Sequence, residues 1–221
     1  MKLSEILFSS TKELWNASAG KPFVVEMAKG TLEDRLFQNY TIQDYLYLLD
    51  YVEILKTIRE KTEREELVSF LDGIIAQTLQ EAERVHLPNI RKYGFSDEKI
   101  KKCPIIPVLS DYLCYMRKCI EDDGLQGGLT ALLQCSWLYA YIGENAMRKY
   151  AEDIARSKYR SWFEAYTCQA YLTANQTWIN FLDAFSSEAE AQAIERLCKI
   201  FQKCAMFENE LWDALYEQKA E

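Results

Sequence analysis

The segment LLQCSWLY, Leu132 to Tyr139, places Cys135 in the middle of an apolar run. Tyr139 follows Cys135 by four residues, so a helix would carry the thiol and the phenol on one face. A thiolate becomes a useful nucleophile when an acid, a base or a hydroxyl lies beside it. A cysteine in a leucine-rich helix is nevertheless more often a small core residue. Cys135 therefore needs partners from elsewhere in the chain before a reaction can be assigned to it.

Two acidic residues occur among apolar neighbours. Asp44 and Tyr47 are three residues apart in FQNYTIQDYLYL, which places both on one face of a helix. Glu208 lies in MFENELW. A carboxylate in such surroundings is partly desolvated, and desolvation raises its pKa toward that of a usable proton donor or acceptor. Because an unpaired buried carboxylate is costly, these positions are informative, although a solvated acid is the commoner arrangement.

Two further tyrosines stand at apolar positions: Tyr112 in VLSDYLCYM and Tyr166 in WFEAY. Like Tyr47 and Tyr139, they occupy positions where a simple helical bundle would have Leu, Ile, Val or Ala, and a functional role would be one explanation. The alternative is core packing, because the chain has 14 tyrosines and tyrosines in helical proteins often lie at the edge of a core. The residue types leave both interpretations open.

His86 is the only histidine in the chain. A Ser–His–Asp or Cys–His enzyme would have to use it, and a metal site with several histidines is not available. Glu83 and His86 have the Glu-x-x-His spacing of a di-iron half-site, but the required second pair is missing. We therefore expect an ordinary histidine at the surface or the core edge, and we predict neither a metal site nor a cofactor.

The composition excludes several classes of protein. The 221 residues carry a formal net charge of −8, which argues against nucleic acid as a partner because phosphate binding needs a basic face. The N-terminal sequence interrupts its apolar positions with charges, unlike a signal peptide, and no apolar run is long enough for a membrane span. Seven cysteines without a CxxC pair indicate reduced thiols. We expect a cytoplasmic protein.

Apolar residues recur at helical spacing through most of the chain, and no alternating strand pattern is found. Ser4 and Thr41 are expected to cap helices, Pro88 to lie just beyond the end of one, and Gly124, Gly127 and Gly128 to form a turn. The sequence predicts one all-α domain over residues 1–221. Its main helices are expected at 4–19, 31–39, 41–60, 63–86, 108–122, 129–150, 159–185 and 187–219.

Six blocks in this order resemble the TenA family, which includes thiaminase II, also called aminopyrimidine aminohydrolase. They are an early Pro-Phe, FQNYTIQDYLYL, SDYLCYM, LLQCSWLYAYIGE, WFEAY and FENELW. Each block alone is weakly specific, but together they cover essentially the whole chain. The resemblance implies a haem-oxygenase-like all-α bundle in a single domain, usually assembled as a homotetramer.

The resemblance also implies a role for each candidate residue. Cys135 matches the nucleophile, Glu208 the catalytic acid, and Tyr47 a hydroxyl that supports the cysteine. Asp44 matches the carboxylate that holds the aminopyrimidine. Tyr112, Tyr139 and Tyr166 match tyrosines of the substrate pocket. The implied reaction replaces the amine, or the thiazole of thiamine, on the C5 methylene of a 4-amino-2-methylpyrimidine by hydroxyl, in thiamine salvage.

Two alternatives remain beside this enzyme. A non-catalytic aminopyrimidine-binding or regulatory protein could keep Asp44 and the tyrosines, yet it would have no use for Cys135 paired with Glu208. Haem degradation or an oxidative reaction on the same fold would need one or more histidines, and a single His86 speaks against both.

Overall fold

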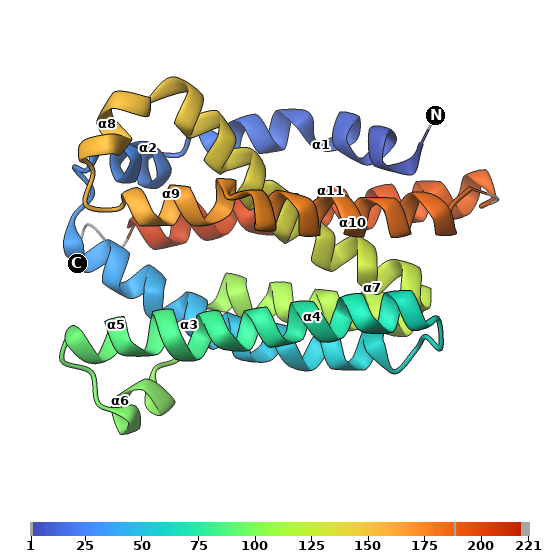
Figure 1. The fold of residues 1–221 in the computed structure, drawn as a ribbon, viewed down its shortest axis with the longest axis horizontal. Helices are drawn as coiled ribbons and strands as arrows, with labels where there is room; N and C mark the ends of the chain where they lie inside the picture. The colour runs from blue at the N-terminus through green and yellow to red at the C-terminus, as the bar shows by residue number, and fades with distance from the viewer. Residues whose placement is uncertain (1, 188, 218–221) are drawn as a thin grey trace. The chain divides into compact units, whose positions relative to one another are not determined.

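The computed structural model describes residues 2–187 and 189–217, and within these ranges all regular structure is helical (Figure 1). This confirms the all-α prediction. The expected end of the last helix, near Lys219, lies outside the described residues. The elements are α1 (Leu3–Ala19), α2 (Pro22–Lys29), α3 (Asp34–Arg59), α4 (Glu65–Glu81), the π-helix η1 (Ala82–His86), α5 (Leu87–Lys92), α6 (Asp97–Lys102), α7 (Pro107–Lys149), α8 (Ala151–Arg156), α9 (Arg160–Thr167), α10 (Gln169–Phe185) and α11 (Ala191–Glu217).

The chain divides into two compact units. The terminal unit comprises residues 1–32 and 126–221, and the central unit comprises residues 33–125. The division falls within α7, next to Gly124, whose φ of 61° and ψ of −143° interrupt the helix. A positive φ suits glycine, whereas Gly127 and Gly128, expected in the same turn, are helical. The prediction of one domain over residues 1–221 stays a prediction.

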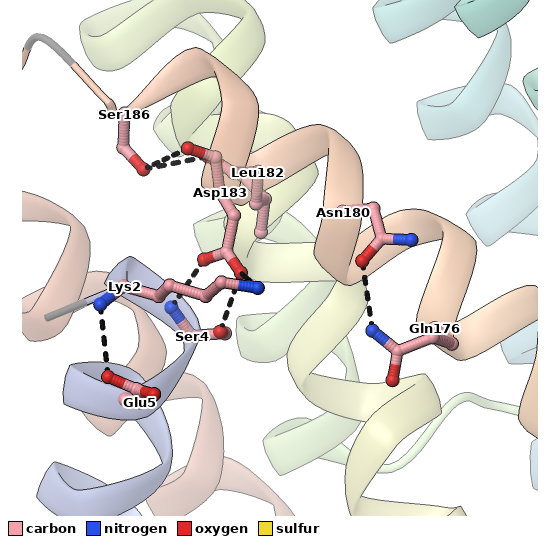
Figure 2. Close-up of polar contacts among 8 residues, drawn as sticks. All are labelled: Lys2, Ser4, Glu5, Gln176, Asn180, Leu182, Asp183 and Ser186. Carbon is pink, nitrogen blue, oxygen red and sulfur yellow. Dashed lines mark hydrogen bonds and ion pairs between the residues drawn. The ribbon is translucent and has the colours of Figure 1, made fainter.

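In the terminal unit, α1 packs against α10 and α11. Leu7, Trp15 and Phe201 are among its buried residues. Ser4 does not cap α1 as expected, because the helix begins one residue before it, at Leu3. Instead its backbone N–H and its hydroxyl each donate to the Asp183 carboxylate at 2.8 Å, as Figure 2 shows. A carboxylate of α10 thus satisfies an N–H of the first turn of α1, which an isolated helix leaves without a partner.

In the central unit, α3 packs against α4, η1 and α5. Thr41 does not begin a helix. It lies inside α3, where its hydroxyl donates to the carbonyl of Phe37 at 2.8 Å, so the two helices expected around it are one. Gln43 accepts from the N–H of Ile106 at 2.9 Å and donates to the carbonyl of Pro104 at 3.0 Å. This side chain ties the segment that precedes α7 to α3.

Two other expected boundaries differ from the structure. Pro88 does not end the helical chain. It lies in the first turn of α5, directly after η1, where a missing N–H is tolerated. The helix expected over residues 159–185 is interrupted at Cys168, whose extended backbone separates α9 from α10. Among the described helices, none combines the length and apolar character needed to cross a membrane.

Candidate functional site

Tyr139 is the centre of a buried aromatic cluster in the terminal unit. Its ring centroid lies 5.0 Å from that of Tyr166, 5.8 Å from that of Trp162 and 5.7 Å from that of Trp212. The rings of Trp162 and Tyr166 are 4.7 Å apart. The four side chains come from α7, α9 and α11 and are buried. The structure therefore brings the predicted Tyr139 and Tyr166 together, and adds Trp162 and Trp212 to them.

Cys135 is half-buried and lies one helical turn before Tyr139 on α7. The next residue, Ser136, is tied to α10. Its hydroxyl donates to Asn175 Oδ1 at 2.7 Å, and its carbonyl accepts from the Tyr171 hydroxyl at 3.0 Å. These contacts fix the backbone beside the thiol. The motif WFEAY did not point to Tyr171 or Asn175, because both lie beyond the interruption at Cys168.

Glu208 is almost completely buried, with 1% of its surface exposed. It precedes Trp212 by four residues on α11, so both side chains lie on one face of that helix. Trp212 in turn contacts the ring of Tyr139. The apolar setting expected for Glu208 is thus found, and α11 places a carboxyl group and the aromatic cluster on the same side.

Asp44 lies on α3 in the central unit with 9% of its surface exposed. Its Oδ2 accepts from the Tyr40 hydroxyl at 3.3 Å. Nε2 of His86 lies 3.1 Å from the same oxygen and 3.6 Å from Glu81 Oε1. These imidazole contacts have ion-pair distances without the alignment of a regular hydrogen bond. Asp44 therefore belongs to a carboxylate–imidazole–carboxylate group in which Asp44 and His86 are buried and Glu81 is half-buried.

His86 is not the ordinary surface or core-edge histidine that we expected, because it has only 8% of its surface exposed and contacts two carboxylates. Glu83, which has the Glu-x-x-His spacing to His86, is exposed, and the glutamate beside the imidazole is Glu81. The reason is η1, which covers residues 82–86. A π-helix has i→i+5 hydrogen bonds, so Glu81 and His86, five residues apart, meet on one side of the chain.

The charge of His86 follows from these contacts. Burial by itself lowers the pKa of the imidazole, but the Asp44 and Glu81 carboxylates outweigh burial and raise the pKa from 6.5 to about 10. His86 is therefore an imidazolium at neutral pH. Together the three side chains carry one positive and two negative charges when both carboxyl groups are ionised.

The same three residues are the described group that could hold a metal ion, because one ligand atom from each lies within 4.8 Å of the others. One imidazole and two carboxylates would suit zinc or iron. An imidazolium nitrogen cannot ligate, however, and a metal ion would have to displace its proton. The predicted absence of a metal site stays a prediction.

Tyr47 and Tyr112 complete the candidates of the central unit. Their rings are stacked with centroids 6.2 Å apart and an interplanar angle of 25°, and both side chains are buried. The Tyr47 hydroxyl points to the sulfur of Met116 at 4.0 Å. Of the seven predicted residues, Asp44, Tyr47 and Tyr112 thus belong to the central unit, and the other four belong to the terminal unit.

Comparisons with known proteins give a consistent result. The family model of TENA/THI-4/PQQC matches residues 9–218. An aminopyrimidine aminohydrolase of Helicobacter pylori is 27% identical over 222 residues, covering 98% of this chain and 100% of that protein. A solved TenA homologue from Pyrococcus furiosus matches with a TM-score of 0.86 at 20% identity, covering 97% of this chain and 100% of that chain.

A third match identifies the fold. A domain of unknown function from Shewanella denitrificans, described as having a heme oxygenase-like fold, matches with a TM-score of 0.75 at 12% identity. It covers 100% of this chain and 94% of the other. The expected haem-oxygenase-like all-α fold is confirmed. Since the family match extends over nearly the whole sequence, this chain belongs to the TENA/THI-4/PQQC family.

Proposed function

We propose that this chain is an aminopyrimidine aminohydrolase of the thiaminase II type, acting in thiamine salvage. The observation that carries the proposal is the aromatic cluster around Tyr139, one helical turn from the half-buried thiol of Cys135. Such a cluster suits a flat heterocycle, and the thiol is the nucleophile that an aminopyrimidine needs. The name of the Helicobacter pylori relative supports the same activity.

In this proposal Cys135 attacks C6 of the pyrimidine, the unsubstituted ring carbon next to the carbon that bears the aminomethyl group. A C–S bond forms while Glu208 donates a proton to a ring nitrogen, and the ring loses its aromaticity. The C–N bond of the aminomethyl group then breaks and ammonia leaves. Water adds to the methylene carbon, the C–S bond breaks, and the ring becomes aromatic again. The net change is R–CH2–NH2 plus water to R–CH2–OH plus ammonia.

The remaining residues bind the substrate in this proposal. The Asp44 carboxylate accepts from the exocyclic 4-amino group, because a carboxylate is a strong acceptor for such a donor. Tyr112, Tyr139 and Tyr166 contact the ring, and Tyr47 supports the nucleophile. No cofactor is needed. We also propose a cytoplasmic homotetramer, whose mass light scattering after gel filtration would test.

The test is ammonia release from 4-amino-5-aminomethyl-2-methylpyrimidine. We expect turnover by the wild type and at least about 10³-fold lower kcat for Cys135→Ala. Cys114→Ser is a matched control, because Cys114 is an exposed cysteine of the same helix. Equal rates for the wild type and Cys135→Ala would refute the role of the thiol. Tight binding of the pyrimidine without ammonia release would instead support the non-catalytic binder.

A further inference from the structure

We infer that the His86 imidazole, which lies between the Asp44 and Glu81 carboxylates, holds the Asp44 carboxylate in one orientation, so that His86 is a positioning residue for the pyrimidine. This inference rests on the proposed function, in which Asp44 accepts from the 4-amino group of the substrate. It extends that function to two residues outside the expected set. It also assigns a use to the one histidine of the chain.

The geometry gives each member of the group a separate place. Asp44 comes from α3, Glu81 from the end of α4 and His86 from the end of η1. Both described contacts of the Asp44 carboxylate, from Tyr40 and from His86, use Oδ2. Two contacts at one oxygen fix the plane of the carboxylate and leave the other oxygen, Oδ1, to the ligand. A side chain held in this way loses less conformational freedom when the substrate binds.

The charges explain why a cation is needed. The Asp44 and Glu81 ligand oxygens lie within 4.8 Å of each other, and two negative charges at this separation repel each other. Without a cation between them, this repulsion would push the Asp44 carboxylate away from the position in which it accepts from the amine of the substrate. The imidazolium of His86 lies within ion-pair distance of both carboxylates. It therefore offsets the repulsion and holds the Asp44 carboxylate through Oδ2, without occupying Oδ1.

The protonation of His86 can be observed directly, because the chain contains one histidine and its imidazole signals have no overlap. We expect NMR of the wild type to show an imidazolium through pH 8 and a titration midpoint of about 10. Glu81→Gln should lower this midpoint, whereas Glu83→Gln, a matched change at an exposed glutamate two residues away, should leave it in place. An imidazole that titrates with the ordinary pKa of about 6.5 in the wild type would overturn the inference.

The effect on the substrate is tested by kinetics. We expect His86→Gln to raise KM for the aminomethyl pyrimidine by about 10- to 100-fold, the range for loss of a charge-assisted contact, with a much smaller change in kcat. Far-UV circular dichroism checks that each variant is folded. An unchanged KM would refute the inference.

A double variant separates positioning from a merely structural role. In Glu81→Gln/His86→Gln the second carboxylate is absent, so Asp44 no longer has a like charge beside it. We expect KM to recover at least partly relative to His86→Gln alone. A KM that is higher in the double variant than in either single one would contradict this explanation. Glu83→Gln/His86→Gln is the matched control and should show no recovery.

The outcomes also distinguish this inference from the proposed function. If the wild type neither binds the pyrimidine nor releases ammonia, the proposed function is wrong, and the NMR titration still tests the ion pair. If the wild type is active and His86→Gln has the same KM, only the inference fails. A stoichiometric metal ion that EDTA removes from the wild type and that His86→Gln does not bind would overturn the ion pair in favour of a metal site.

Discussion

Removal of the His86 imidazole should change how the stability of the protein depends on pH. The pKa of His86 is about 10 in the folded protein, whereas an unfolded chain has the ordinary histidine value of 6.5. Because the folded state holds the proton more tightly, the stabilisation is fully present below pH 6.5 and is lost as the pH rises through 10. From these two pKa values, protonation of His86 adds about 4 kcal/mol to the free energy of unfolding at about pH 7 and about 1.4 kcal/mol at about pH 9.

The measurement is urea unfolding of the wild type, His86→Gln and Glu83→Gln at both pH values, followed by far-UV circular dichroism. The difference in unfolding free energy between the wild type and His86→Gln should shrink by about 2.5 kcal/mol between the lower and the higher pH. Other groups that titrate in this range cancel in the difference. The Glu83→Gln control should run parallel to the wild type. If His86→Gln also runs parallel to the wild type, the imidazole is not the group that binds the extra proton, and the reasoning is refuted.

Three further predictions follow from contacts in both units. Glu208→Gln should lower kcat for ammonia release by about 10²- to 10⁴-fold, whereas Glu210→Gln, at an exposed position of α11, should leave it unchanged; equal kcat values in the two variants would contradict the acid role. Asp183→Ala removes both 2.8 Å contacts with the start of α1 and should lower the unfolding free energy in urea by about 2 to 3 kcal/mol; a loss below about 0.5 kcal/mol would show that solvent replaces them. Deletion of Val85, which is 51% exposed within η1, should convert the π-turn to α-helix. The histidine would then follow Glu81 by four residues, so its imidazole should stay protonated at pH 8. A neutral imidazole at that pH would show that the π-turn itself is required.

The parts of the fold that were predictable are those where local pattern and final packing agree. The run from Leu129 to Tyr150 is apolar at helical spacing, and nearly all of it forms the second part of α7. The four-residue separation of Cys135 and Tyr139 therefore indicates the correct helical face. Contacts between distant segments carry no such local signal. Asp183 meets the start of α1 from 179 residues away, and nothing in the sequence around Ser4 indicates that partner.

The candidate site shows the same division. Asp44 and Glu208 stand out because burial of an unpaired carboxylate in an apolar run is costly, and both are buried. Their surroundings could not be predicted in the same way. Trp162 and Trp212 lie inside the motifs WFEAY and FENELW, but their contact with Tyr139 depends on how α7, α9 and α11 pack. Residue types thus indicate where chemistry could occur, while packing decides which rings surround it.

His86 shows why a sound local rule can select the wrong partner. Spacing on an α-helix favours Glu83, three residues before it, and that pairing suggests no function. The chain instead forms a π-turn over residues 82–86, followed directly by a helix with Pro88 in its first turn. A proline inside a continuous α-helix would clash with the carbonyl four residues before it at a cost of about 3 kcal/mol, whereas Pro88 lies in the first turn of α5, directly after the π-turn. The same change of register turns Glu83 to solvent and brings Glu81 to the imidazole.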